Sequence, residues 1–211
     1  ANPNDMFRRS IKTEIYERAA MVSDPLNMFD VAPIADGSAA VLLTRPELLP
    51  PNYSKPLVRI AGSSLVTDTL ALHDRPDPLV FHAARLSVER ACQRARVSPL
   101  QVDLFELHDA YSIFAVLSLE AAGFANPGEG WRLAQDSCIG LSGSMPISTM
   151  GGLKARGYPG GASGVYQAAE AVLQLRDQAG DNQIQGARRA MIQSLGGPAS
   201  TAVTHLLEVL S

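Results

Sequence analysis

The sequence is poor in cysteine, in basic runs and in long apolar stretches, and each shortage excludes a class of protein. It has two cysteines among 211 residues, which excludes a disulfide framework and favours a reducing, cytoplasmic location. Its lysines and arginines form no run and the formal net charge is -3, so no nucleic-acid partner is expected. No apolar run approaches the roughly 20 residues that cross a bilayer, so no membrane span is expected.

Histidine is also scarce, which bears on metal binding. The four histidines are scattered along the chain and none has a cysteine pair beside it, so no metal site is expected. Apolar residues make up 46% of the chain and charged residues 18%, as in globular proteins with a substantial core.

Segments typical of strands alternate with segments typical of helices, which predicts an α/β layered fold. The expected strands are residues 39–43, buried on both faces, and residues 57–66, 102–107, 188–194 and 200–210. The expected helices are residues 4–20, 79–96, 112–122 and 160–179, the second of them capped by Asp77. Residues 126–150 are expected to be rich in loops.

The first candidate site is His108-Asp109-Ala110-Tyr111, at the end of an expected strand. Sites in open α/β sheets collect at the carboxyl ends of strands, and histidine is the usual acid or base near neutral pH. The alternative interpretation is that His108 and Asp109 only cap the helix that follows.

The second candidate site is the glycine-rich stretch 151–164, which has six glycines in 14 residues and runs into a helix. Glycines allow a ligand to approach the backbone closely, and free amides at a helix start can hold an anion or an oxyanion. It is not a phosphate-binding P-loop, because no Gly-Lys-Ser/Thr follows the glycines. The alternative is a corner that lets two helices pack.

A third, weaker candidate is the stretch 194–198, Ser-Leu-Gly-Gly-Pro, between two expected strands. A Gly-Gly turn between strands is usually only a hairpin. It is kept as a candidate because it follows the other two candidates along the chain.

Taken together and in this order, the stretches resemble the thiolase superfamily. The resemblance is carried by residues 25–43, 106–124, 148–176 and 194–206. It is strongest to the branch with sterol-carrier-protein-type thiolases, archaeal thiolases and lipid-transfer-protein-like aldolases. It implies a thiolase-like αβαβα layered fold built from two similar halves. Residues 1–50 would be the end of the N-terminal half, with its last strand, and residues 51–211 the C-terminal half.

The sequence departs from the family at the positions that carry the chemistry. Where thiolases have a catalytic histidine between Gly and Pro, this chain has Tyr158, and the region of the family's second catalytic cysteine reads Ser194-Leu195. The nucleophilic cysteine of the family belongs to the N-terminal half. Claisen condensation is therefore expected to be disabled. The expected reaction is the retro-aldol cleavage of a β-hydroxyacyl-CoA, such as one with a steroid side chain, because this reaction needs no covalent acyl-enzyme.

The resemblance assigns roles to residues of this chain. The expected catalytic residues are Tyr158, Tyr111 and His108. The expected CoA- and substrate-binding residues are Ala32, Pro33, Gly151 and Gly152. The expected oxyanion or turn residues are Ser194, Gly196 and Gly197. Two alternatives stay open, a thiolase-type acyltransferase and a non-catalytic acyl-CoA-binding or scaffold subunit.

The resemblance also implies partners. A truncated sheet would expose apolar surface and unpaired edges, so a complementary N-terminal thiolase half is expected, as a separate chain or a cleaved part. A thiolase-like dimer and a small protein with an OB fold and a zinc ribbon are the other expected partners. No tightly bound cofactor is expected, and coenzyme A enters as part of the substrate.

Overall fold

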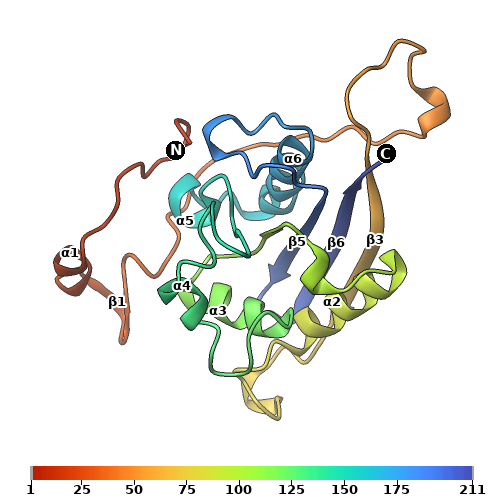
Figure 1. Cartoon of the computed structure of the whole chain (residues 1–211). Helices are drawn as coiled ribbons and strands as arrows, with labels where there is room; N and C mark the ends of the chain where they lie inside the picture. The colour runs from red at the N-terminus through yellow and green to blue at the C-terminus, as the bar shows by residue number, and fades with distance from the viewer. Residues whose placement is uncertain (1, 211) are drawn as a thin grey trace.

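A mixed four-stranded sheet forms the centre of the computed structural model, which describes residues 2–210 (Figure 1). The strand order is β3-β6-β5-β4, in which β6 is antiparallel to both of its neighbours and β4 is parallel to β5. The strands are β3 (Val58–Thr67), β4 (Leu104–Glu106), β5 (Arg189–Gly196) and β6 (Thr201–Val209). The sequence-based predictions of these four strands are confirmed, although β4 is shorter than expected.

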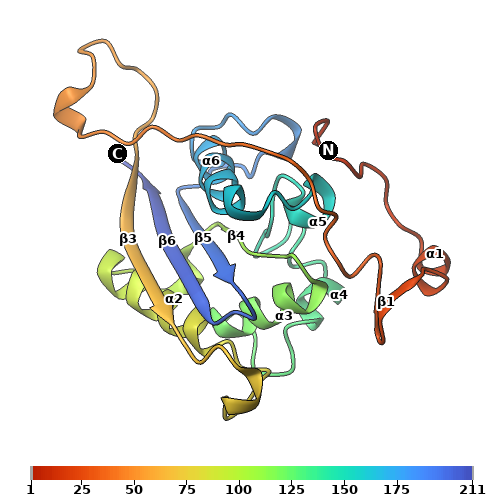
Figure 2. The ribbon, with the colours of Figure 1, turned by 180° about the vertical axis from the view of Figure 1, so that it is seen from behind.

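Helices cover both faces of this sheet, which confirms the predicted α/β layering. Helices α2 (His82–Ala95) and α3 (Ser112–Ala121) pack on one face, and α6 (Ser163–Leu175) packs on the other, as the view from behind shows (Figure 2). Two short helices, α4 (Arg132–Gln135) and α5 (Gly152–Arg156), lie in the connections. Single 3-10 turns occur at Pro46–Leu48, Leu72–Asp74, Pro99–Gln101, Gly160–Ala162 and Gly180–Asn182.

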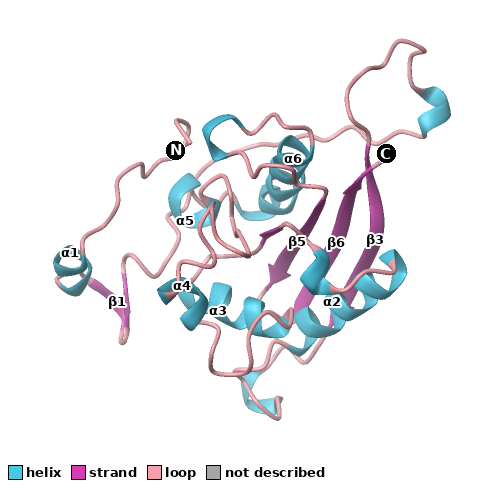
Figure 3. Ribbon diagram, viewed as in Figure 1, coloured by secondary structure: helices cyan, strands magenta, loops and turns pink. Residues whose placement is uncertain are grey.

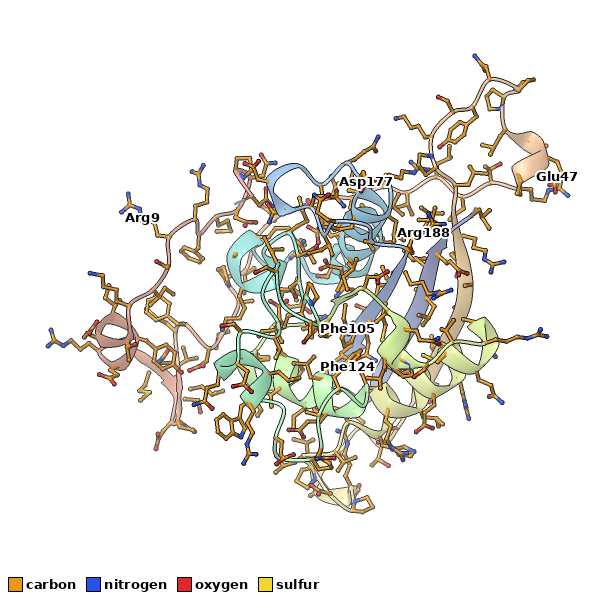
Figure 4. The ribbon with its side chains drawn as sticks, viewed as in Figure 1. Arg9, Glu47, Phe105, Phe124, Asp177 and Arg188 are labelled. Carbon is orange, nitrogen blue, oxygen red and sulfur yellow. The ribbon has the colours of Figure 1, made fainter. Side chains whose placement is uncertain are left out.

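The core lies on both faces of the sheet, with its largest cluster between the sheet and the α2 and α3 layer and another between the sheet and α6. Phe105 of β4 is fully buried, and its ring centroid lies 5.9 Å from that of Phe124, which follows α3 (Figure 4). Burying a phenylalanine stabilises the fold by about 2–3 kcal/mol. At Gly62 of β3, an added Cβ would lie 2.1 Å from the carbonyl oxygen of Ala91, so glycine is what lets α2 rest directly on the strand.

Residues 2–50 are mostly irregular, and the helix predicted over residues 4–20 is wrong. Only α1 (Thr13–Glu17) is helical, followed by a small hairpin of β1 (Met21–Ser23) and β2 (Leu26–Asn27) (Figure 3). Helix α1 has no buried residue, and a short helix without a packed face is marginal in water. The apolar residues that recur at helical spacing therefore have no surface to pack against.

The strand predicted over residues 39–43 is also wrong within residues 2–210. The segment has no sheet partner there and crosses over α6 toward β3 (Figure 2). Its side chains are exposed, with Val41 at 43%, Leu42 at 93% and Leu43 at 72%. An apolar run becomes a buried strand only where neighbouring strands and covering layers meet it, and the described part of the chain supplies neither.

Helix α2 begins later than the sequence predicts. Asp77 does not cap it, because the Asp77 carboxylate accepts a hydrogen bond at 2.8 Å from the Leu79 amide in a turn before the helix, and Phe81 is the N-cap residue. Likewise, α6 starts at Ser163 and not at residue 160, because a 3-10 turn precedes it. Among residues 2–210, no helix combines the length and the apolar character needed to cross a membrane.

Candidate active site

The first candidate loop follows β4 directly. His108 and Asp109 are buried, at 4% and 6% exposure, whereas Tyr111 is 38% exposed. The N-cap residue of α3 is Tyr111, and the Asp109 carboxylate instead accepts a hydrogen bond at 2.8 Å from the amide of Leu153 in α5. The alternative that Asp109 merely caps the next helix is therefore wrong, because Asp109 joins the first candidate loop to the second.

A short extended segment, residues 31–35, lies between the two loops and pairs with both. The Ala32 amide donates to the Ala110 carbonyl at 2.8 Å, and on the other edge the Tyr158 amide donates to the Pro33 carbonyl at 2.7 Å. Successive residues of an extended chain direct their amides and carbonyls to opposite edges, so this segment acts as a middle strand. Ala32 and Pro33, predicted to bind substrate, thus contact the loops that carry Tyr111 and Tyr158.

Asp30 anchors the start of this middle segment, and the sequence reasoning did not single it out. Its carboxylate accepts hydrogen bonds from the Ser112 hydroxyl at 2.7 Å, the Tyr16 hydroxyl at 2.9 Å and the Asn27 amide at 3.0 Å. Burial works to raise the pKa of Asp30, but these hydrogen bonds and the nearby Lys154 hold it below its usual value. The charged Asp30 therefore ties the N-terminal segment to the start of α3.

His108 and Tyr158 meet edge to face at the centre of the candidate site. Their ring centroids are 5.5 Å apart and the rings are perpendicular. The Nδ1 atom of His108 is buried and has no hydrogen-bond partner within residues 2–210. Burial lowers the pKa of His108 to about 4, so the imidazole is neutral at pH 7 and presents one donor and one acceptor. This pair can orient a polar group of a substrate and exchange a proton with it.

Tyr111 lies on the other edge of the middle segment. Its backbone pairs with Val31, and its ring lies 5.2 Å from the ring of Phe114 between centroids. The backbone of Tyr158 pairs with Ile34, in a parallel bridge where the Val31 and Tyr111 bridge is antiparallel. The structure therefore places the two predicted tyrosines on opposite sides of residues 31–35, and within residues 2–210 no hydrogen bond joins their side chains.

Two carboxylates lie so close to Gly151 and Gly152 that a larger residue would not fit at either position. Their φ angles are +104° and +61°, in the region that favours glycine. A Cβ on Gly151 would lie 2.4 Å from an Asp5 carboxylate oxygen, and one on Gly152 would lie 2.3 Å from an Asp109 carboxylate oxygen. The glycines thus let acidic side chains close on the loop, a use that the sequence did not indicate.

The third candidate loop lies against the start of α6. A Cβ on Gly164 would lie 3.5 Å from the Ser194 hydroxyl, so Ser194 packs on the first turn of α6, a few residues after Tyr158. Gly196 ends β5 and Gly197, with φ +57°, begins the turn. No hydrogen bond within residues 2–210 links Ser194 to His108 or to Tyr158, so its role in the site stays a prediction.

A hollow of about 490 Å³ adjoins the site, between residues 35–40, the N-terminal segment and α6. Ala35 and Asp36 from the first of these and Gly157 and Pro159 from the glycine-rich stretch line it together. Its lining includes none of the four predicted CoA-binding residues, Ala32, Pro33, Gly151 and Gly152, so their role in binding CoA stays a prediction. Within residues 2–210 no group of His, Cys, Asp or Glu side chains is arranged to hold a metal ion.

A cluster of buried acids around Arg156 lies behind the glycine-rich loop. The Arg156 guanidinium forms an ion pair with Glu170, and its charge also acts on Asp5, Glu106 and Asp109. Burial, the largest cause, raises the pKa of all four carboxyl groups, and the charge of Arg156 partly offsets it. For Glu106, burial and the adjacent Glu170 raise the pKa to about 7.

A model of the thiolase C-terminal domain-like family matches residues 64–209 of this chain. The chain belongs to the thiolase family. This thiolase-family chain is 40% identical to the acetyl-CoA acetyltransferase of Methanothermobacter thermautotrophicus over 97% of its own length and 53% of that protein. It is 30% identical to sterol carrier protein 2 of Rattus norvegicus over 96% of its own length and 38% of that protein. It spans about half the length of the archaeal relative.

The fold of this thiolase-family chain also matches solved structures. The structure titled "Ltp2-ChsH2(DUF35) aldolase" superposes with a TM-score of 0.79 at 20% identity, over 95% of this chain and 52% of that one. At that identity the likeness shows the fold alone. The predicted membership of the thiolase superfamily and the predicted thiolase-like layered fold are both confirmed.

The stability of the fold should depend on pH through two buried groups of this site, the acid Glu106 and the base His108. The folded-state pKa of His108 is about 4, below its ordinary 6.5, so His108 destabilises the fold as pH falls through that window. The folded-state pKa of Glu106, which faces Glu170 and Arg156, is about 7, above its ordinary 4.5, so its contribution is lost as pH rises through that window. Between pH 5 and 6.5 the two effects oppose each other.

We therefore expect Glu106→Gln to uncover the histidine effect. Its free energy of unfolding should fall as pH is lowered from 6.5 to 5, with a slope approaching about 1.4 kcal/mol per pH unit relative to wild type. His108→Gln should show the opposite slope. Urea denaturation of the assembled protein at pH 5, 6 and 7 measures both slopes. Identical pH profiles for wild type and both variants would contradict the assignment.

Proposed function

We propose that this protein acts on acyl-CoA thioesters and that its reaction is the retro-aldol cleavage of a β-hydroxyacyl-CoA. The observation that carries the proposal is Tyr158, which stands where thiolases have a catalytic histidine and lies edge to face with the buried, neutral His108. In this reaction the β-hydroxyl proton passes to a base and the bond between the α and β carbons breaks. A ketone or aldehyde leaves, and the thioester enolate takes up a proton at its α carbon.

The residues divide this work between them. Tyr158 is the proposed acid and base, because a phenol can both accept and donate a hydrogen bond. His108, which is neutral, donates its N–H to the thioester oxygen and stabilises the enolate as an oxyanion hole does. Tyr111 is the second proposed acid or base. Ala32, Pro33, Gly151 and Gly152 form the proposed backbone wall for the CoA arm, and no tightly bound cofactor is involved.

An acyltransferase reaction is the second candidate, and the 40% identical archaeal relative named acetyl-CoA acetyltransferase supports it. It requires a cysteine nucleophile, which would come from the proposed N-terminal half. Tyr158, in place of the family histidine, favours the retro-aldol reaction over condensation, because thiolase condensation relies on the imidazole of that histidine. A scaffold subunit without activity is the third reading.

A direct assay separates these candidates. The assembled protein is incubated with a β-hydroxyacyl-CoA that bears a bulky apolar group, such as a steroid side chain, and separately with acetyl-CoA. We expect a carbonyl compound and a shortened acyl-CoA from the first substrate and no acetoacetyl-CoA from the second. Condensation of acetyl-CoA without cleavage of the β-hydroxyacyl-CoA would establish the acyltransferase, and inactivity toward both would leave the scaffold.

We also propose that residues 2–50 and α6 meet a complementary N-terminal thiolase half. The exposed apolar residues Val41, Leu42 and Leu43 support the proposal, since their backbone has no sheet partner within residues 2–210. The hollow beside α6 adds a concave surface next to that segment. In this scheme residues 1–50 complete the N-terminal half, and residues 51–211 form the C-terminal half.

Expression should test this partner. We expect the chain by itself to be largely insoluble or aggregated, because exposed apolar side chains such as those of residues 41–43 favour association. Co-expression with a complementary thiolase half should recover it as a defined complex in size-exclusion chromatography. A monodisperse, cooperatively folding monomer of the chain alone would overturn the proposal. A thiolase-like dimer, an OB-fold and zinc-ribbon partner and a cytoplasmic location are further proposals that follow from the family.

A further inference from the structure

The loop that precedes Tyr158 is tied to the His108 strand at two points. Glu106, two residues before His108, accepts hydrogen bonds through one carboxyl oxygen from the Thr149 amide at 2.8 Å and the Thr149 hydroxyl at 2.6 Å. Asp109, one residue after His108, accepts from the Leu153 amide at 2.8 Å. Residues 149–153 are thus held by hydrogen bonds to two acids, one on each side of the candidate catalytic histidine in the sequence.

This loop needs outside support to keep its shape. Ser148 has a φ of +43°, which is unfavourable for a residue other than glycine and costs about 1 kcal/mol or more. Thr149 is held from other elements as well, because the Gln174 side-chain amide donates to its hydroxyl at 2.9 Å and the Asn182 side-chain amide donates to its carbonyl at 2.7 Å. Glu106 is the acidic member of this buried network and is 1% exposed.

The geometry of the loop determines where Tyr158 lies. The Asp109 anchor point, Leu153, lies within α5, and Gly157 is the one residue between the end of this helix and Tyr158. The Glu106 anchor point, Thr149, lies three residues before α5 begins. The φ of Gly157 is +107°, and a Cβ there would lie 2.6 Å from the Cβ of Ala35, so the chain passes close to the middle segment before it reaches Tyr158. A displacement of Thr149 would therefore shift Tyr158 relative to His108.

We propose that Glu106 is a positioning residue, which fixes Thr149 and thereby sets the edge-to-face contact of Tyr158 with His108. It does not touch the proposed reacting groups itself. The last step of this inference, its effect on turnover, rests on the proposed retro-aldol function, whereas the geometric step does not. An acid is suited to this place, because one carboxyl oxygen can accept both donors of Thr149.

Three substitutions test whether Glu106 positions the loop through its hydrogen bonds or only fills volume. Glu106→Gln keeps an oxygen acceptor for Thr149, whereas Glu106→Leu leaves the Thr149 amide and hydroxyl buried without a partner. Thr149→Val removes the hydroxyl donor and keeps the amide. The matched control is Glu89→Leu, since Glu89 lies on the exposed side of α2 with a side chain that is 53% exposed.

A second measurement, besides activity, is the NMR signal of the Tyr158 ring. It is recorded on the assembled protein after its tyrosines are labelled with carbon-13. The chain has five tyrosines, so the signal that Tyr158→Phe removes is readily assigned. Its chemical shift reports the ring current of His108 at 5.5 Å. We expect this shift to stay at its wild-type value in Glu106→Gln and Glu89→Leu, and to move toward that of an exposed tyrosine in Glu106→Leu.

Turnover is measured on the same samples with a β-hydroxyacyl-CoA. We expect Glu106→Leu to lower kcat by about 100-fold with little change in KM, because a displacement of about 1 Å has that effect on a reacting group. Glu106→Gln should restore most of the loss. A folded Glu106→Leu protein with an unchanged Tyr158 signal and unchanged kcat would overturn the proposal. If wild type cleaves no β-hydroxyacyl-CoA, the proposed function fails, and the Tyr158 signal still decides the positioning role.

Discussion

Tyr158→Phe should lower the kcat for retro-aldol cleavage by about 100- to 10,000-fold, the usual loss when a positioned acid or base is removed. The substitution deletes one hydroxyl and leaves the ring, which packs edge-on against His108 and beside Ala32, Ala110 and Leu153. The fold should therefore persist, and KM should change little. Steady-state kinetics of the purified complex, with circular dichroism as a check of folding, measures the effect.

Two other tyrosines make this result specific. Tyr53, whose hydroxyl accepts a hydrogen bond from Arg176 in an exposed loop, provides the control, and Tyr53→Phe should leave kcat unchanged. Tyr111→Phe tests the other proposed tyrosine. If Tyr158→Phe kept near-wild-type turnover while Tyr111→Phe lost it, Tyr158 would be a spacer and the catalytic role would pass to Tyr111.

Gly152→Ala should destabilise the protein by about 3 kcal/mol or more and inactivate it. Alanine at the φ of +61° costs about 1–2 kcal/mol in backbone strain. Its Cβ would also lie 2.3 Å from the Asp109 carboxylate, so Asp109 must move away from Leu153, and a lost hydrogen bond to a charged group costs about 1.5–3 kcal/mol. Urea denaturation of the assembled protein measures the loss.

Gly180→Ala is the matched control for that experiment. Gly180 has nearly the same φ, +58°, but an added Cβ there meets no atom within 4 Å. It should therefore show the strain alone, about 1–2 kcal/mol. Equal losses at the two positions would mean that the Asp109 carboxylate has no part in holding the glycine-rich loop.

The sheet was predictable because its strands contain the apolar side chains that become buried when they pair. Residues 57–66 and 200–210 contain several β-branched side chains, residues 188–194 contain three apolar residues in succession, and in the structure residues 200–210 pair with both of the other segments. Residues 39–43 are apolar as well, yet no strand pairs with them in the described part of the chain. A single sequence shows that a segment is suited to a sheet and not whether strands are there to receive it.

The site was predictable only in part, and for a similar reason. The sequence indicated His108 and the glycine-rich stretch, and the resemblance to thiolases brought Tyr158 to notice. The resemblance also named Ala32 and Pro33, but it did not show that residues 31–35 join the two loops, because they do so through backbone amides and carbonyls, which leave no mark in side-chain spacing. Glu106 escaped because a single acid at the end of an apolar strand gives no sign of the Thr149 hydrogen bonds that it accepts.

The middle segment also has a consequence for the order of folding. The hairpin of β5 and β6 forms from residues that are close in the chain, whereas Ala32 and Pro33 must find Ala110 and Tyr158, which are synthesised much later. Closing such long loops costs entropy before any contact compensates it, so non-local pairings form slowly. The layered scaffold should therefore assemble first, and the two loops should be joined in one of the last steps, when residues 31–35 enter between them.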